Sequence, residues 1–171
     1  MLVFWKSPRT IIPMLPIAMR FDHVSLAVRT MAAAMPLYRD LLGGRYVQSG
    51  ENNQAGRHFR WLEMQMPGGA MLELIEPAGP DSFLHAFLDK RGEGVHHFTF
   101  QVDSLRQALD ELRGHGYEPV QVDASNPHWR EAFIHPKQGH GVLIQLFESD
   151  LSLEQQEALQ QTDWGRALAF G

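Results

Sequence analysis

The stretch Phe21-Asp22-His23-Val24-Ser25-Leu26-Ala27-Val28 returns later in the chain in altered form, as Val95-His96-His97-Phe98-Thr99-Phe100-Gln101-Val102. The two copies share a histidine, a small hydroxyl residue and a closing valine at matching positions. Around these positions apolar residues alternate with other residues, which is the pattern of a β-strand with two different faces. The chain therefore carries an internal duplication, and each copy should open with a strand.

The residues that follow keep the same order of elements in both copies. A helix is expected from Ala32 to Leu42 in the first copy and from Ser104 to Leu112 in the second, and glycines follow both. Further on, Leu72-Glu73-Leu74-Ile75-Glu76 matches Ile144-Gln145-Leu146-Phe147-Glu148, and a glycine-containing turn precedes each of these strands. Each copy thus has the order βαβββ.

This repeat predicts an α+β protein made of two tandem βαβββ modules. One module of this size would expose a face of its sheet, whereas two can bury it and leave a cleft between them. The C-terminal tail, from Leu151 to Phe170, has helical spacing and should form a helix that docks on the body or on a second subunit. The expected divisions are an N-terminal extension at 1–20, a first module at 21–77, a linker with a short helix at 78–94, a second module at 95–149 and the tail at 150–171.

The composition limits the partners of the chain. Its 171 residues, of which 44% are hydrophobic, suffice for one buried domain or two small modules that share a core. The formal net charge is −5, the isoelectric point is about 6.0, and lysine and arginine form no run. We therefore expect a small-molecule partner, and neither nucleic acid nor a membrane. Because cysteine is absent, any metal must be held by histidine, carboxylate or amide side chains.

The first twenty residues resemble a secretory signal only faintly. Lys6 and Arg9 precede a short apolar stretch, but Pro13 and Pro16 interrupt it and no A-x-A-like cleavage site follows. The stretch is also shorter than the ~20 apolar residues that a membrane span needs. We therefore expect the protein to be cytoplasmic.

Four polar residues are expected to face the cleft. Alternation along the strands places His23 and His97 opposite the apolar side chains. Glu73 and Gln145 each stand alone between apolar neighbours in a strand, a position that costs free energy unless a partner is present. The duplication makes His23 with Glu73 and His97 with Gln145 two equivalent pairs. Four ligands would then converge on one divalent cation.

Any one of the nine histidines is more often a hydrogen-bonded residue of a half-buried strand than a metal ligand. The coincidence of four polar positions at matching offsets is what favours a metal site. Nitrogen and oxygen ligands suit Co, Zn, Ni, Mn or Fe better than Ca, which prefers oxygen ligands alone. His96, His135 and His140 are left out, because His96 should point away from His97 and the other two lie beside turn residues.

From about Phe21 to Glu148, the chain resembles the glyoxalase/bleomycin-resistance/dioxygenase superfamily, also called the vicinal-oxygen-chelate superfamily. The resemblance implies a curved mixed sheet around a metal-binding cleft, and it places the family's metal ligands on His23, Glu73, His97 and Gln145. The stretches most similar to methylmalonyl-CoA epimerases are Leu72-Glu73-Leu74-Ile75-Glu76-Pro77, Gly92-Glu93-Gly94-Val95-His96-His97, and His135-Pro136-Lys137 with Gly141-Val142-Leu143-Ile144.

The resemblance implies a metal-dependent isomerase that acts through an enolate, most similar to an acyl-CoA epimerase. A cation would stabilise the enolate while a carboxylate accepts the proton. The sequence departs from the family at Gln145, where epimerases carry a glutamate that binds the ion and moves the proton. Glu73 would then be the only ligand able to accept a proton, and Glu63 could supply an acid on the opposite face. Lys137 and Arg130 could meet the phosphates of CoA.

Three other functions stay open. A glyoxalase I-like lyase uses similar ligands and a single carboxylate base, which Glu73 could supply. An extradiol dioxygenase needs two histidines and one carboxylate around Fe(II), and His23, His97 and Glu73 offer these residue types. A non-catalytic protein of the bleomycin-resistance type could bind a small molecule in the same cleft. By family analogy, we also expect a homodimer.

Overall fold

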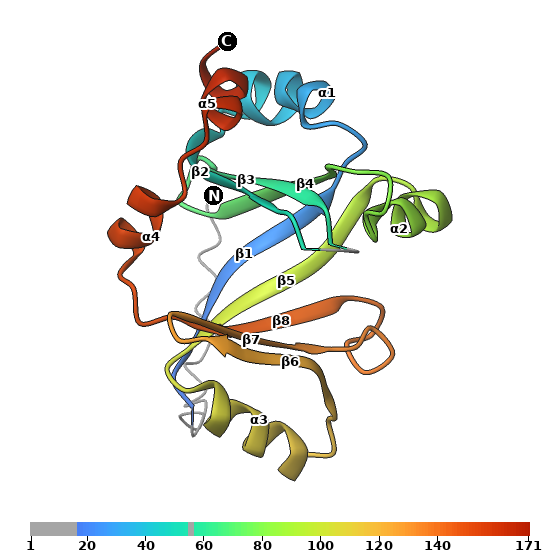
Figure 1. Cartoon of the computed structure of the whole chain (residues 1–171), viewed down its shortest axis with the longest axis vertical. Coiled ribbons are helices and arrows are strands. Elements are labelled where there is room, and N and C mark those ends of the chain that lie inside the picture. The colour runs from blue at the N-terminus through green and yellow to red at the C-terminus, as the bar shows by residue number, and fades with distance from the viewer. Residues whose placement is uncertain (1–16, 55–56) are drawn as a thin grey trace, which may run out of the picture.

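The structure is a computed structural model that describes residues 17–54 and 57–171. Its eight strands form one mixed sheet in the order β2-β3-β4-β1-β5-β8-β7-β6 (Figure 1). The predicted α+β fold of two tandem βαβββ modules is confirmed, because β1 to β4 with α1 are followed by β5 to β8 with α3. The strands are β1 (Met19–Ala27), β2 (Arg45–Asn52), β3 (Phe59–Gln65), β4 (Met71–Pro77), β5 (Gly94–Val102), β6 (Pro119–Asn126), β7 (Trp129–Ile134) and β8 (Leu143–Glu148).

The helices lie around the outside of the sheet. Figure 1 shows α1 and α5 beyond the strands of the first module, α3 beyond those of the second, and α2 at one end of β1 and β5. The buried cores of the two modules accordingly contain residues of α1 and of α3. The helices are α1 (Met31–Met35) with its continuation η1 (Pro36–Leu41), α2 (Leu84–Arg91), α3 (Leu105–Gly114), α4 (Leu153–Leu159) and α5 (Asp163–Phe170).

The two modules join through their first strands. β1 and β5 pair antiparallel at the centre of the sheet, and each pairs in parallel with the last strand of its own module. In the first module Ser25 lies opposite Glu73, and in the second module Thr99 lies opposite Gln145. The duplication seen in the sequence is therefore repeated in the register of the strands.

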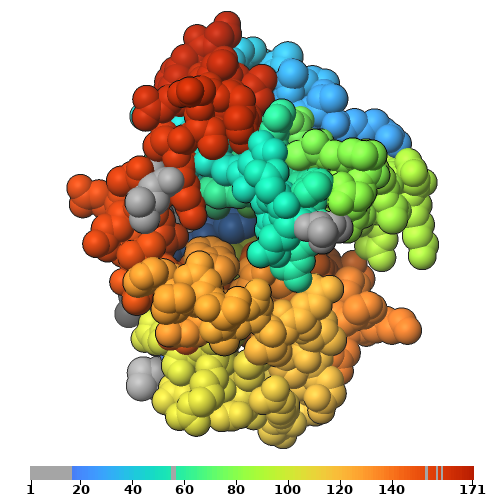
Figure 2. Space-filling model, in the orientation of Figure 1, coloured from blue at the N-terminus to red at the C-terminus, as the bar shows by residue number. Residues whose placement is uncertain are grey.

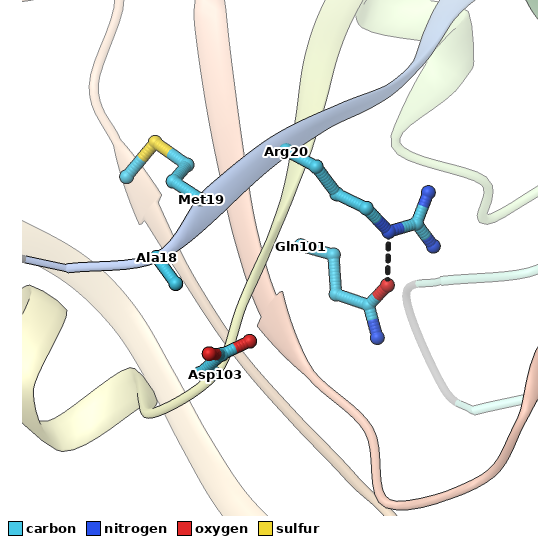
Figure 3. A pocket seen from close by; sticks show the side chains of 5 residues that line it. All are labelled: Ala18, Met19, Arg20, Gln101 and Asp103. Carbon is cyan, nitrogen blue, oxygen red and sulfur yellow. Dashed lines mark hydrogen bonds between the residues drawn. The ribbon is translucent and has the colours of Figure 1, made fainter.

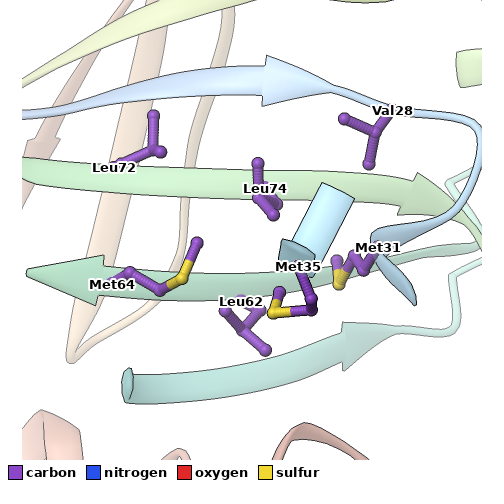
Figure 4. Close-up of a cluster of buried hydrophobic side chains, with 7 residues drawn as sticks. All are labelled: Val28, Met31, Met35, Leu62, Met64, Leu72 and Leu74. Atoms are coloured by element: carbon purple, nitrogen blue, oxygen red, sulfur yellow. The ribbon is translucent and has the colours of Figure 1, made fainter. Parts of the chain in front are cut away.

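The core of the first module lies between the sheet and α1 (Figure 4). Leu72 and Leu74 of β4 share this face with residues of β3, whereas Glu73, which falls between them in sequence, lies on the opposite face. Burying the apolar face thus fixes which polar residues reach the cleft. The buried members of this core are Val28, Met31, Met35, Leu62, Met64, Leu72 and Leu74.

The helix expected from Ala32 to Leu42 is present but changes type along its length. Pro36 has no backbone N–H, so the α-helical hydrogen bond that this residue would donate is missing. The segment from Pro36 to Leu41 is wound as a π-helix, in which Leu42 N–H donates to Leu37 O at 2.9 Å. Gly43 then ends the helix with a φ of 75°, a conformation that glycine adopts without a steric penalty.

The C-terminal tail forms two helices, α4 and α5, instead of the single helix expected. Residues 160–162 separate the two helices because they run along edge strand β2 and bond to it. Ser49 N–H donates to Gln160 O at 2.8 Å, and the Gln161 side chain donates to Val47 O at 2.9 Å. Trp164 of α5 packs against the first-module core. The tail thus docks on the first module of its own chain and covers polar groups of an otherwise open sheet edge.

The first strand extends past the start expected for the first module. β1 begins at Met19, two residues before the expected start, because its pairing with β5 continues as far as Val102. The expected extension at 1–20 lies outside the described residues as far as residue 16, and the short helix expected in the linker is α2. Within the described part of the chain, no helix combines the length and apolar character needed to cross a bilayer.

Candidate metal centre

The molecule is hollowed between its two modules. Figure 2 shows this hollow between the β2–β3 hairpin, the C-terminal tail and the strands of the second module, with atoms of the N-terminal strand at its bottom. Buried polar residues from the two central strands lie on the corresponding sheet face: His23 and Ser25 from β1, and His97 and Thr99 from β5. Such polar residues are costly to bury unless they are paired, so this face is built for polar contacts.

Glu73 brings the two histidines together. Its carboxylate atom Oε2 lies 3.7 Å from Nε2 of His23 and 3.6 Å from Nε2 of His97. Two ligand atoms that each lie ~2.1 Å from a tetrahedral ion are about 3.4 Å apart. The spacing of these three ligand atoms therefore matches a shared cation with little movement of the side chains.

Gln145 is connected to His23 through the hydroxyl of Thr99. Thr99 Oγ1 lies 2.9 Å from His23 Nε2 and donates to Gln145 Oε1 at 2.9 Å. The structure therefore gathers all four residues that the sequence singled out as ligands. Three of them offer ligand atoms within 4.8 Å of one another, and the fourth reaches them across one hydrogen-bonded hydroxyl.

One atom shows that a cation fits this group. Among the residues that the structure describes, Glu73 Oε2 is one of the buried side-chain atoms without a hydrogen-bond partner. It points between two imidazole nitrogens, where a divalent ion would bind it and both rings at once. The nitrogen and oxygen donors suit Co, Zn, Ni, Mn or Fe, as expected from the sequence.

The charges around the two histidines differ. Burial would lower the pKa of His23, but the carboxylates of Glu73, Asp22 and Glu63 outweigh burial and raise that pKa to about 9. Burial lowers the pKa of His97 well below its ordinary value, and it raises the pKa of Glu73. A proton on His23 thus balances the carboxylates, and an ion bound at Nε2 would take the place of that proton.

Two further carboxylates lie beside the other nitrogen of His23, and only Asp22 is within hydrogen-bond distance of it. Asp22 Oδ2 lies 2.9 Å from His23 Nδ1, and Glu63 Oε1 lies 3.6 Å from the same atom. Glu63 is 7% exposed, so its carboxylate is buried at the site and does not face solvent. Burial raises the pKa of Glu63 to about 7. A carboxylate at Nδ1 fixes the ring with Nε2 free to bind a metal.

Sequence reasoning missed Asp22. A signal was present, because an acidic residue directly precedes the candidate ligand His23. Strict alternation would have sent its side chain to the other face of β1. The pairing of β1 with β5 shifts register between Phe21 and His23, and this irregularity brings Asp22 beside its neighbour.

The expectation that His96 points away from His97 is wrong. The Nδ1 atoms of the two rings lie 2.9 Å apart. The register of β1 and β5 steps from His97 to Val95 and leaves His96 in a bulge, so the alternation of faces fails there. Phe83 and Phe87 contact the His96 ring from the linker side. Burial lowers the pKa of His96 to about 4, so it is a neutral hydrogen-bond partner for His97.

The chain matches a known family over most of its length. The model of the Glyoxalase/Bleomycin resistance protein/Dioxygenase superfamily matches residues 22–133, which include three of the four candidate ligands. The chain belongs to this superfamily. The resemblance that the sequence motifs carried is thereby confirmed.

Named relatives of this superfamily member include methylmalonyl-CoA epimerases. The mitochondrial methylmalonyl-CoA epimerase of Mus musculus is 30% identical over 130 residues, covering 74% of this chain and 71% of the relative. An uncharacterized Bacillus subtilis protein, YqjC, is 31% identical over 134 residues, covering 75% and 91%. The crystal structure of methylmalonyl-CoA epimerase from Mycobacterium tuberculosis superposes with a TM-score of 0.67 at 34% identity, covering 78% and 90%.

The chain is also similar to a solved structure that contains a bound ligand. It is a Streptomyces coelicolor methylmalonyl-CoA epimerase variant in complex with 2-nitronate-propionyl-CoA, with a TM-score of 0.63 at 29% identity. The match covers 77% of this chain and 98% of that chain. The C-terminal tail described above adds two helices after β8, the last strand of the repeat.

The structure does not bring Arg130 and Lys137, the two residues predicted to contact CoA, to the candidate metal ligands. The Arg130 guanidinium donates to Glu148 Oε1 at 2.6 Å, on the side of β7 where Ala132 packs into the second-module core. Lys137 is exposed in the turn that precedes β8. Contact of either residue with CoA phosphates stays a prediction.

A cation that the sequence did not single out lies at the edge of the inner face. Arg20 Nε donates to Gln101 Oε1 at 2.7 Å, beside a pocket of about 230 Å³ that Met19 and Asp103 help to line (Figure 3). The same guanidinium lies 2.9 Å from Asp22. The candidate ligand His23 is thus linked through Asp22 to an exposed arginine.

Proposed function

We propose that this chain is a metal-dependent epimerase that acts on an acyl-CoA thioester of the methylmalonyl-CoA type through an enolate. The observation that carries the proposal is the buried Glu73 Oε2 atom between the Nε2 atoms of His23 and His97. The similarity to methylmalonyl-CoA epimerases supports the substrate class. His23, Glu73, His97 and Gln145 would hold one divalent ion.

The proposed reaction moves a proton and leaves the oxidation state of the substrate unchanged. The C–H bond next to the thioester carbonyl breaks, its electron pair moves toward the carbonyl oxygen, and the proton passes to a carboxylate. A bound divalent ion supplies stabilisation for the negative charge on that oxygen. Return of a proton to the opposite face of the same carbon gives the epimer.

The first module offers two carboxylates for these proton transfers. Glu73 and Glu63 lie opposite each other on β4 and β3, and both are buried. We assign proton acceptance to Glu73 and proton delivery on the other face to Glu63, whose pKa of about 7 suits both gain and loss of a proton near neutral pH. Lys137 and Arg130 remain proposed contacts for CoA phosphates, and the homodimer and cytoplasmic location remain predictions.

The test is exchange of the substrate α-proton in deuterated water, followed by NMR with methylmalonyl-CoA and the cobalt-loaded protein. Wild type should exchange the proton. Glu73→Gln should lose exchange together with much of its cobalt, whereas Glu63→Gln should keep its cobalt and lose exchange from one epimer. The exposed Glu118 provides a control, because Glu118→Gln should behave as wild type.

A cobalt-loaded wild type without exchange would overturn the epimerase proposal. The same loaded protein would then be assayed for isomerisation of a hemithioacetal, for cleavage of a catechol with Fe(II), and for tight binding of bleomycin. Each assay detects only one of the three alternative functions: the lyase, the dioxygenase or the binding protein. The two metal-dependent alternatives are included because His23, His97 and Glu73 offer donors that suit their metals.

A further inference from the structure

Glu131 of β7 makes a direct contact with the candidate ligand Gln145 of β8. The Gln145 amide donates from Nε2 to Glu131 Oε2 at 2.7 Å. Glu131 is partly buried and was not singled out by the sequence motifs. The oxygen of the same amide, Oε1, accepts from Thr99 Oγ1 on the cluster side. The two ends of the Gln145 side chain therefore have separate partners.

The partners of Glu131 use its carboxylate as a hydrogen-bond acceptor. Trp129 Nε1–H donates to the same oxygen at 3.2 Å, and Arg57 Nη1 lies 3.7 Å from the other oxygen. Arg57 comes from the first module, so this ion pair crosses between the modules. A carboxylate oxygen that accepts hydrogen bonds from N–H groups donates none. It can therefore contact the NH₂ end of the Gln145 amide and not the oxygen end.

This contact decides which atom of Gln145 faces the metal site. An amide can rotate by half a turn and present either its oxygen or its NH₂ group, and only the oxygen binds a cation. We propose that Glu131 is a positioning residue that holds the Gln145 amide with its oxygen toward the metal site. The inference rests on the proposed function only in taking Gln145 as a ligand.

The same pair explains why an amide suits position 145 in this chain. A glutamate at that position would place a second carboxylate about where Nε2 now lies, 2.7 Å from Glu131 Oε2. Two carboxylates at that distance repel each other unless one takes up a proton. The amide at 145 and the carboxylate at 131 are therefore matched to each other, and changing one should require changing the other.

The experiment is a double-substitution cycle with Glu131→Gln, Gln145→Glu and the combination of both. The first readout is the cobalt dissociation constant of the metal-free protein, measured by calorimetry, and the second is the visible spectrum of the cobalt protein. Glu131→Gln should weaken cobalt binding about 10–100-fold, as loss of a carboxylate that orients a ligand does. In the combined variant, the amide introduced at 131 can donate to the carboxylate introduced at 145. That variant should bind cobalt at least tenfold more tightly than Gln145→Glu alone.

A spectroscopic measurement on the wild type tests the position of the Gln145 amide even if one variant does not fold. In a proton–nitrogen correlation spectrum, the Gln145 side-chain amide, assigned by its absence in Gln145→Glu, should show one strongly deshielded proton. Addition of cobalt should alter this pair of signals, whereas Glu118→Gln should leave it unchanged. An amide pair without the deshielded proton would overturn the inference.

The outcomes separate this inference from the proposed function. If wild type binds no cobalt, the metal-dependent function fails. If wild type binds cobalt while Glu131→Gln binds it equally well, or Gln145→Glu equals the combined variant, the positioning role of Glu131 is wrong and the proposed function stands. If the cycle behaves as expected and α-proton exchange is absent, Glu131 orients a ligand in a metal site that serves another reaction.

Discussion

Replacement of Glu73 by glutamine should remove most of the stabilisation that a metal gives to this fold. An ion that binds only the folded protein stabilises it by about 2.7 kcal/mol when free ion is present at about 100 times the dissociation constant. In a protein of this size, each kcal/mol raises the melting temperature by roughly 2–4 °C, so cobalt should raise that of the wild type by about 5–11 °C.

Glu73→Gln removes the charge that lies between the two imidazoles. The carboxylate oxygen is 3.7 Å and 3.6 Å from the two Nε2 atoms and is buried, so water cannot readily replace it. Loss of a carboxylate that only supports a ligand costs about 10–100-fold in affinity, so loss of a ligand charge should reach at least the upper figure. At the same cobalt concentration the variant would keep about 0.4 kcal/mol, or roughly 1–2 °C.

The assay is differential scanning calorimetry of metal-free protein with cobalt and with chelator, supported by calorimetric titration. Glu118→Gln, at an exposed position, should keep the full shift. A Glu73→Gln protein that melts like wild type at both metal levels would refute the reasoning, because the buried oxygen would then not be a ligand.

Three further predictions concern other parts of the molecule. Asp22→Asn should weaken cobalt binding about 10–100-fold in a calorimetric titration, because Asp22 Oδ2 holds His23 Nδ1 at 2.9 Å. Leu74→Ala should lower the free energy of unfolding by about 2–5 kcal/mol in urea, because Leu74 is fully buried in the first-module core. Gly165→Ala should speed proteolysis of the tail, because a Cβ there would lie 2.1 Å from Ser49 Oγ, whereas Gly114→Ala meets open space and should not.

The two-module fold could be predicted from the sequence, because each module must bury one face of its sheet and its strands therefore show the same alternation of apolar and polar residues. Strands that must cover one face of a module show alternation, and the same alternation in two copies identifies both the fold and the residues that face the cleft. The path of the tail could not be predicted in this way. Whether a helical segment continues or breaks to follow β2 depends on hydrogen bonds such as that from Ser49 N–H to Gln160 O, which join residues far apart in the chain.

In the site, sequence reasoning gathered the four candidate ligands but not the residues that hold them. Alternation predicts a face only where the strand is regular, and β1 and β5 shift register beside both histidines. These shifts bring Asp22 to His23 and His96 to His97. Glu131 could not be predicted for a different reason. Its contact with Gln145 depends on the register between β7 and β8, which the sequence does not reveal.

The duplication repeats the geometry of the site but not its charge. Around His23 the first module places the carboxylates of Asp22, Glu63 and Glu73, whereas His97 contacts the neutral ring of His96. A divalent ion bound between the two histidines would therefore have its balancing charge on one side. The carboxylates to which we assign proton transfer, Glu73 and Glu63, are also on this side, so proton transfer to and from a substrate should run through the first module. The second module would then contribute neutral donors that shape the site, with Glu131 holding one of them in place.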